Sequence, residues 1–189
     1  HNASPPRSAG TSHILHTMVM LAIYDAVVAI EGKYEPFAKD IYAAPWADVR
    51  AAVATAAHHT ARARIATSQL PALDQQYANY LATIADGPGK NEGIRVGAAA
   101  AAAILERRAD DGFDAVVSYE CSAIPPAIGE FEPDAGCPAG PASPQPVDAK
   151  LGQIEPFTFA EPGRFRMQGP LPLASKPYAD DFDETRRYG

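Results

Sequence analysis

The sequence predicts an all-α protein: a bundle or orthogonal array of about four main helices, a long Pro-rich irregular segment, and a short C-terminal helix. Before Gly112, apolar residues recur at helical spacing, whereas 12 of the 18 prolines lie after it. Proline lacks a backbone donor and is excluded from helix interiors, so the second half cannot continue the helical pattern. We expect a helical bundle over 1–112, an extended wrap or lid over 113–174, and the start of a further, truncated helix over 175–189.

The first predicted helix begins at Thr11 or Ser12, either of which can cap a helix, and ends at Glu31, just before Gly32. Its residues are apolar on nearly every face. This pattern is typical of a helix surrounded by others, so we expect it to be central in the bundle.

A connecting segment, 33–45, precedes the second predicted helix. Its aromatic rings are expected to lie over the bundle and anchor the crossover; they are Tyr34, Phe37 and Tyr42. The second helix is predicted from near Pro45, a residue suited to a first helical turn, to about Ser68.

The third predicted helix opens at Pro71 and stops in the turn 86–89. The fourth runs from about Asn91 to a glycine cap at Gly112. Within it, Gly97 and the six alanines that follow leave a nearly smooth surface, so we expect another helix to approach closely there.

Composition argues against two classes of partner. The net charge of −7 and the pI near 5.1 oppose binding to a phosphate backbone, so we expect no nucleic-acid partner. The longest apolar stretch, Ile14–Ile30, is shorter than the roughly 20 residues that cross a bilayer, so the chain is not expected to span a membrane. No basic region followed by a small-residue cleavage site opens the sequence, so we expect that any secretion signal was removed before residue 1. The location of the protein stays undetermined, with a secreted or periplasmic protein among the options.

Two cysteines, Cys121 and Cys137, lie in the Pro-rich half. A disulfide between them would restrict an otherwise loose segment of the unfolded chain. Two free thiols are the alternative, because two cysteines alone do not establish an oxidising compartment.

The histidines and acids do not form a recognisable metal site. His13 and His16 share a helix face, but two ligands do not make a zinc site, so packed or capped histidines are favoured. The adjacent His58 and His59 point to different faces and mark a boundary between buried and exposed surface. The acidic clusters at 110–111 and 180–184 do not follow the calcium-loop pattern and are interpreted as solvated helix ends.

Asp25 is the one acid inside the first helix. Burying a carboxylate without a partner is costly, so we expect it to be a buried polar residue that meets a hydrogen-bond donor or an arginine, with Arg62 and Arg64 as candidates. A role as general acid or base would need a second polar group and a pocket. No nucleophile elbow, phosphate loop or dinucleotide fingerprint is present, so the residues themselves indicate no catalytic, cofactor-binding or metal-binding position.

Four segments resemble the bacterial vanadium-dependent haloperoxidase-like proteins, members of the superfamily that includes the type 2 phosphatidic-acid phosphatases. The most specific is His16–Ile30 followed at once by Glu31–Phe37, which is similar to the family's opening, His-x-Ala-Met-Tyr-Asp-Ala-Val-Asn-Ala-Ile and then Tyr-Glu-Pro-Tyr. The segments Ala51–Asp86, Gly93–Gly112 and Phe165–Tyr188 are similar in order and spacing. Together they cover most of the chain.

The resemblance implies an all-helical protein in which basic residues hold vanadate or phosphate beside a histidine. The family's motifs for that site are a lysine followed by Arg-Pro, then Pro-Ser-Gly-His, then Ser-Arg with a later histidine. None occurs here, so no catalytic residue is carried over, and vanadate is implied only for the full-length family.

The sequence thus predicts an N-terminal helical domain that supports a catalytic half absent from this chain, inactive by itself. Its expected partner is that C-terminal half or a second copy of the chain. Two other classes stay open: a self-contained helical binding or oligomerisation module, and an enzyme with an unrecognised His/Asp site.

Overall fold

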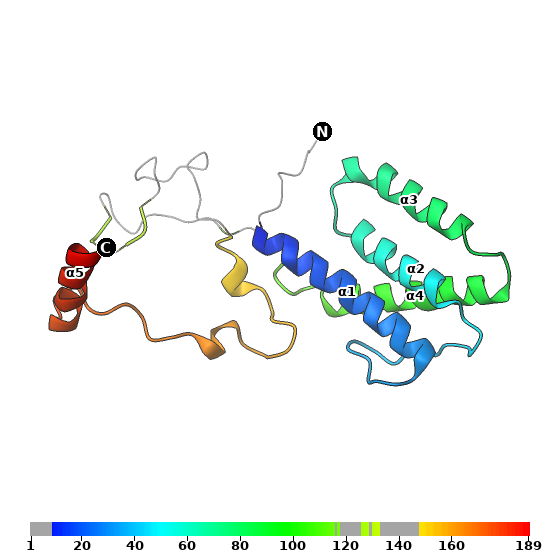
Figure 1. Cartoon of the computed structure of the whole chain (residues 1–189), viewed down its shortest axis with the longest axis horizontal. Coiled ribbons are helices and arrows are strands. Elements are labelled where there is room, and N and C mark those ends of the chain that lie inside the picture. The colour runs from blue at the N-terminus through cyan, green and yellow to red at the C-terminus, as the bar shows by residue number, and fades with distance from the viewer. Residues whose placement is uncertain (1–8, 116, 118–125, 129, 133–147) are drawn as a thin grey trace. The chain divides into compact units, whose positions relative to one another are not determined.

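The computed structural model describes residues 9–115, 117, 126–128, 130–132 and 148–189. These residues form five α-helices and three short 3-10 helices and contain no strand, so the predicted all-α class is confirmed. The chain divides into two units, His1–Phe113 and Asp114–Gly189. The first unit holds α1 to α4, which run in roughly alternating directions along the chain (Figure 1).

Helix α1 spans Ala9–Glu31 and ends where the sequence predicts. Gly32 has a φ of 65°, a left-handed conformation that glycine adopts without steric cost. Its N–H donates to the carbonyl of Val28 at 2.8 Å, which satisfies one of the last free carbonyls of the helix.

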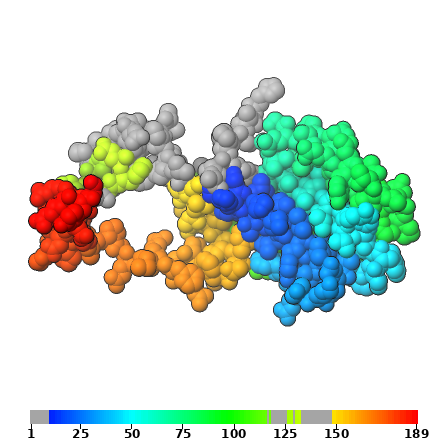
Figure 2. Space-filling view, viewed as in Figure 1, coloured from blue at the N-terminus to red at the C-terminus, as the bar shows by residue number. Residues whose placement is uncertain are grey.

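Within the first unit, the other described helices cover α1 on one side only. Met18, Ala22 and Ala26 recur every four residues and are fully buried where α1 packs on α2 and α4. Met20 and Tyr24, also four apart, are 49% and 39% exposed, and in Figure 2 no other helix of the first unit lies over the blue surface of α1. The expectation that this helix is central is therefore wrong. The central helix is α2, which contacts the other three helices of the unit and whose many alanines leave room on several sides.

Helix α1 is long enough to cross a membrane, so the expectation based on the length of the apolar stretch is also wrong. The segment Gly10–Glu31 is long and apolar enough to cross a bilayer by length and composition, and only 28% of its most apolar part is buried. A core helix of a soluble protein and a signal sequence both have such a composition. The absence of a membrane span therefore stays a prediction.

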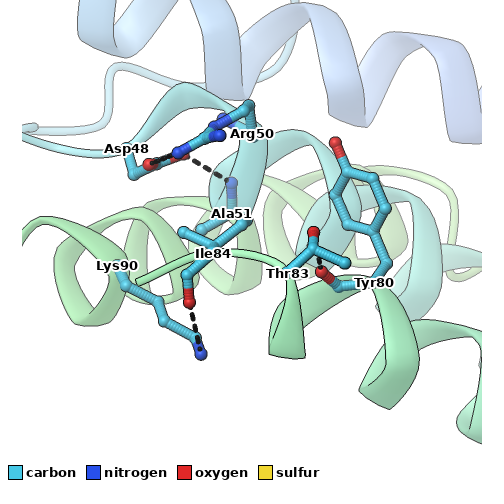
Figure 3. A network of polar contacts seen from close by, with 7 residues as sticks. All are labelled: Asp48, Arg50, Ala51, Tyr80, Thr83, Ile84 and Lys90. Carbon is cyan, nitrogen blue, oxygen red and sulfur yellow. Dashed lines mark hydrogen bonds and ion pairs between the residues drawn. The ribbon is translucent and has the colours of Figure 1, made fainter. Parts of the chain in front are cut away.

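Helix α2 spans Val49–Arg62, shorter at both ends than the predicted stretch from Pro45 to Ser68. Asp48 sets its start: Oδ1 accepts hydrogen bonds from the N–H groups of Arg50 and Ala51 at 2.9 and 3.1 Å (Figure 3). The carboxylate satisfies two N–H groups that would otherwise lack a partner at the start of the helix, which Pro45 cannot do. After the helix ends, the short 3-10 helix η1, Thr67–Gln69, replaces the predicted last turns.

Helix α4 spans Pro88–Arg107 and lies very close to α2. A Cβ atom on Gly93 would collide with the carbonyl oxygen of Asp48, and one on Gly97 with that of Ala52. Such contacts require that only hydrogen atoms separate the two backbones at these positions. The predicted close approach of a second helix at Gly97 is therefore confirmed.

Helix α3, Leu70–Ala82, buries none of its residues and packs mainly on α2. It ends at Ala82, before the predicted turn, and just beyond its end the Thr83 hydroxyl donates to the carbonyl of Tyr80 at 2.7 Å. Beyond it, Lys90 Nζ donates to the carbonyl of Ile84 at 3.2 Å and so ties this end to α4 (Figure 3).

Polar groups, together with one ring, anchor the crossover from α1 to α2. Tyr34 and Tyr42 are 71% and 79% exposed, so the expectation that they lie over the bundle is wrong for these two. Phe37 is half-buried, and Arg107 of α4 lies over its ring. Arg95 instead donates to the carbonyl of Tyr42 at 2.6 Å, and Glu92 accepts the N–H of Ala44 at 3.1 Å. Glu92 and Arg95 also form an ion pair of 2.7 Å. One turn of α4 therefore holds the crossover through its backbone.

In the second unit, the described residues before the last helix form only two 3-10 helices, η2 (Leu151–Gln153) and η3 (Pro162–Phe165). Helix α5 then spans Lys176–Tyr188. As predicted, Ser175 caps it, with Oγ accepting the N–H of Tyr178 at 3.3 Å.

The crossover anchor predicts a loss of stability in acid. The hydrogen bond from the Arg95 guanidinium is the main cause that lowers the pKa of Glu92 from 4.5 to about 2, and the hydrogen bond from the N–H of Ala44 adds to it. Since the folded pKa lies below the unfolded one, this contribution is complete above pH 4.5 and is lost as the pH falls towards 2. Urea unfolding at several pH values should show a shallower acid loss for Glu92→Gln. The matched variant Glu106→Gln, at an exposed position of the same helix, should keep the wild-type slope; equal slopes for all three proteins would contradict the anchor.

Candidate functional site

Asp25 lies on α1 and is fully buried. Its two carboxylate oxygens accept backbone N–H groups of the crossover, from Phe37 at 2.6 Å and from Ala38 at 2.9 Å. The arginines expected as its partners bind elsewhere: Arg62 to Asp74 and Arg64 to the carbonyl of Arg108. Backbone donors replace the arginines because the crossover folds directly back over this turn of α1.

Two further contacts hold the same part of the crossover. The hydroxyl of Tyr24 donates to the carbonyl of Glu35 at 2.9 Å. Arg107 of α4 donates to the carbonyl of Phe37 at 3.1 Å, and its guanidinium carbon lies 4.5 Å from the centre of the Phe37 ring. Each oxygen of Asp25 already accepts a hydrogen bond from a backbone N–H, a group that does not give up its proton. This arrangement suits a structural clamp rather than a general base.

A second polar cluster joins α2 to α3. His58 is buried, and its Nε2 lies 2.7 Å from Oδ1 of Asp74, which also accepts Nε of Arg62 at 3.0 Å. These two hydrogen bonds, that of His58 first, lower the pKa of Asp74 and keep it ionised. The ring of Tyr77 stacks on His58 with centroids 4.0 Å apart, and its hydroxyl lies 2.9 Å from Oγ1 of Thr55.

This cluster brings a histidine and an aspartate within hydrogen-bond distance. The aspartate is Asp74, however, and not Asp25, which was the acid considered for catalysis. Nε2 of His58 is engaged by Asp74. Nδ1 is shielded from solvent and has no hydrogen-bond partner among the described residues. Neither nitrogen is therefore placed to take a proton from a bound substrate, and the geometry serves mainly to fasten α3 to α2.

The other candidate residues do not come together. His13 and His16 are exposed on α1, so the expectation that they are packed is wrong. His58 is buried and His59 is exposed, which is the boundary that the sequence predicts. In the described ranges, no three His, Cys, Asp or Glu residues form a group that could hold a metal ion. Cys121 and Cys137 lie outside the residues that the structure describes.

The interpretation of the acidic pair at 110–111 as a solvated helix end is wrong for Asp111. This residue is 3% exposed and forms a 2.7 Å ion pair with Arg108, which is equally buried. Its Oδ1 also accepts the N–H of Phe113 at 2.8 Å. The chain folds back on the end of α4 at Gly112, whose φ is 82°, so the carboxylate is covered instead of facing water. The second cluster is mostly exposed, with ion pairs from Lys176 to Asp180 and from Arg186 to Asp183.

No family model, curated protein or solved structure matches the chain. The sequence did not predict the contact of His58 with Asp74 and Tyr77. A sign of it was available: Asp74 and Tyr77 are three residues apart and so share one face of α3. What was lacking was the pairing of that face with His58 of α2.

The clamp at Asp25 predicts a specific loss of stability. Asp25→Asn keeps the shape of the side chain but replaces one accepting oxygen with a donor that would face a backbone N–H. We expect a free energy of unfolding lower by about 2 to 3 kcal/mol, because a buried group is left without its partner. The matched variant Asp110→Asn, at an exposed position, should change it by less than about 0.5 kcal/mol in the same urea titration. Equal effects of the two substitutions would refute the clamp.

Proposed function

We propose that this chain is the N-terminal helical domain of a vanadium-dependent haloperoxidase-like or acid-phosphatase-like protein, and that it supports a vanadate- or phosphate-binding half outside these 189 residues. The observation that carries the proposal is the face of α1 that no other helix of the first unit covers. Met20 and Tyr24 are exposed on a helix whose opposite side is fully buried. An apolar helix left open on one side of a folded unit is typical of a surface that another domain covers.

The resemblance in sequence supports the same proposal. Its most specific part joins the helix His16–Ile30 to the segment Glu31–Phe37, and Asp25 and Phe37 from these two parts are in direct contact. The resembling residues thus form one local unit rather than scattered matches. In this proposal the clamp fixes the crossover, while the open face of α1 packs on the catalytic half. The domain supplies support and shielding, and vanadate or phosphate is bound entirely by that other half.

Two alternative functions have less support. A self-contained helical binding module is supported by one observation, an apolar hollow between α1, α2 and α3. An enzyme that uses a His/Asp pair is less well supported, because the nitrogens of His58 are engaged or shielded.

The proposal is tested by activity. Vanadate-dependent halide oxidation and phosphate-ester hydrolysis should be measured on the product of the full reading frame and on this chain alone. We expect one of the two activities in the longer product and neither in this chain. In the longer product, Met20→Glu should lower the activity by weakening the contact between the halves, since a buried unpaired charge is costly.

The control for that variant is Gln75→Glu, at an exposed position on α3 away from the open face of α1. It should leave the activity of the longer product unchanged. Turnover by this chain alone, or a reading frame whose product is no longer than this chain, would overturn the proposal.

A further inference from the structure

Helix α3 has the weakest packing of the helices in the first unit. It buries none of its residues and packs mainly on α2, whereas α1, α2 and α4 each bury several. Figure 1 shows it at the edge of the unit, beside α2. A helix of 13 residues is only marginally stable in water by itself, so α3 depends on these contacts to stay folded.

The chain is held to α4 on both sides of α3. Before α3, the guanidinium of Arg64 donates to the carbonyl of Arg108 at 3.0 Å, at the end of α4. After α3, Ile84 is buried, and its carbonyl accepts Nζ of Lys90 in the first turn of α4 at 3.2 Å. The segment between Arg64 and Ile84 can therefore leave α2 without breaking either of these two contacts.

The polar contacts described between α3 and α2 come from one turn of α3. Asp74 accepts Nε of Arg62 at 3.0 Å and lies 2.7 Å from Nε2 of His58. The hydroxyl of Tyr77 lies 2.9 Å from Oγ1 of Thr55. Because these contacts are made by one turn of a single helix, they are lost together when that turn moves away.

His58 links the two residues of α3. Its Nε2 contacts Asp74, while its ring is stacked on that of Tyr77 with centroids 4.0 Å apart. Leu73, the apolar residue beside Asp74, is only half-buried and lines the hollow next to α2. Since half-buried apolar side chains contribute less than buried ones, the contact of His58 with Asp74 and Tyr77 is the main attachment of α3.

We propose that α3 is a flap that opens as one unit between Arg64 and Ile84, with the contact of His58 with Asp74 and Tyr77 as its latch. In the open form α1, α2 and α4 stay packed, and the face of α2 that lines the hollow is uncovered. This inference goes beyond the proposed function and can fail separately from it, because it concerns contacts within the first unit.

Native-state hydrogen exchange of the whole chain tests the flap. We expect the amides from Asp74 to Ala82 to share one free energy of opening, lower than that of buried positions on α4 such as Val96 and Ala100. Exchange in α3 should also depend less on urea than exchange in α4. The reason is that opening one helix exposes less surface than unfolding the whole unit.

Asp74→Ala tests the latch. Alanine is the best helix former, so faster exchange in this variant cannot come from a weaker helix. We expect the α3 amides to exchange at least about tenfold faster, because His58 loses its hydrogen bond to a carboxylate. Tyr77→Phe keeps the ring and removes the hydroxyl that faces Thr55. It should accelerate exchange by a smaller factor, and it serves as the test if Asp74→Ala does not fold.

The matched control is Asn79→Ala, at an exposed position of the same helix. Its side chain accepts only from Gln75 among the described hydrogen bonds, so exchange in α3 should stay within about twofold of the wild type. Circular dichroism establishes that each variant has kept its helices.

Three results would overturn the assignment. The first is an equal free energy of opening and an equal urea dependence for the amides of α3 and α4, because α3 would then open only when the whole unit unfolds. The second is exchange that slows gradually from the ends of α3 to its middle, which is fraying and not the opening of one unit. The third is unchanged exchange of the α3 amides in folded Asp74→Ala.

Discussion

The close approach of α2 and α4 is the constraint on which the first unit depends. Gly93 and Gly97 let the backbone of α4 meet the carbonyl groups of α2 directly, so these two helices pack backbone to backbone. With α4 on one side, α2 still offers short alanine side chains to α1 and α3. The same small residues therefore explain both the tight centre of the unit and the hollow beside it.

Polar groups then fix what the apolar contacts leave free. Asp25 and Arg107 hold the beginning of the crossover, Glu92 and Arg95 hold its end, and Asp48 starts α2. Each of these side chains binds backbone atoms rather than other side chains alone. The crossover is thus secured from both α1 and α4, on the side of α1 that is buried in the first unit.

The sequence was informative about features that depend on interactions between residues close together in the chain. Helical periodicity gave the all-α class, Gly32 marked the end of α1, and Ser175 marked the start of α5. It was less informative where the partner is distant in sequence. Asp25 could be recognised as needing donors, but not that Phe37 and Ala38 would supply them. The burial of Asp111 and the cluster around His58 likewise depend on how helices pack, which periodicity does not specify.

The central claim is that another domain covers the open face of α1, and methionine oxidation tests it most directly. The chain has three methionines: Met18 is fully buried, Met20 is 49% exposed and Met167 is 85% exposed. Hydrogen peroxide should oxidise Met20 readily in this chain, with Met18 as the protected internal reference. In the product of the full reading frame, Met20 should become as slow to oxidise as Met18. Equal rates for Met20 in the two proteins would contradict the claim.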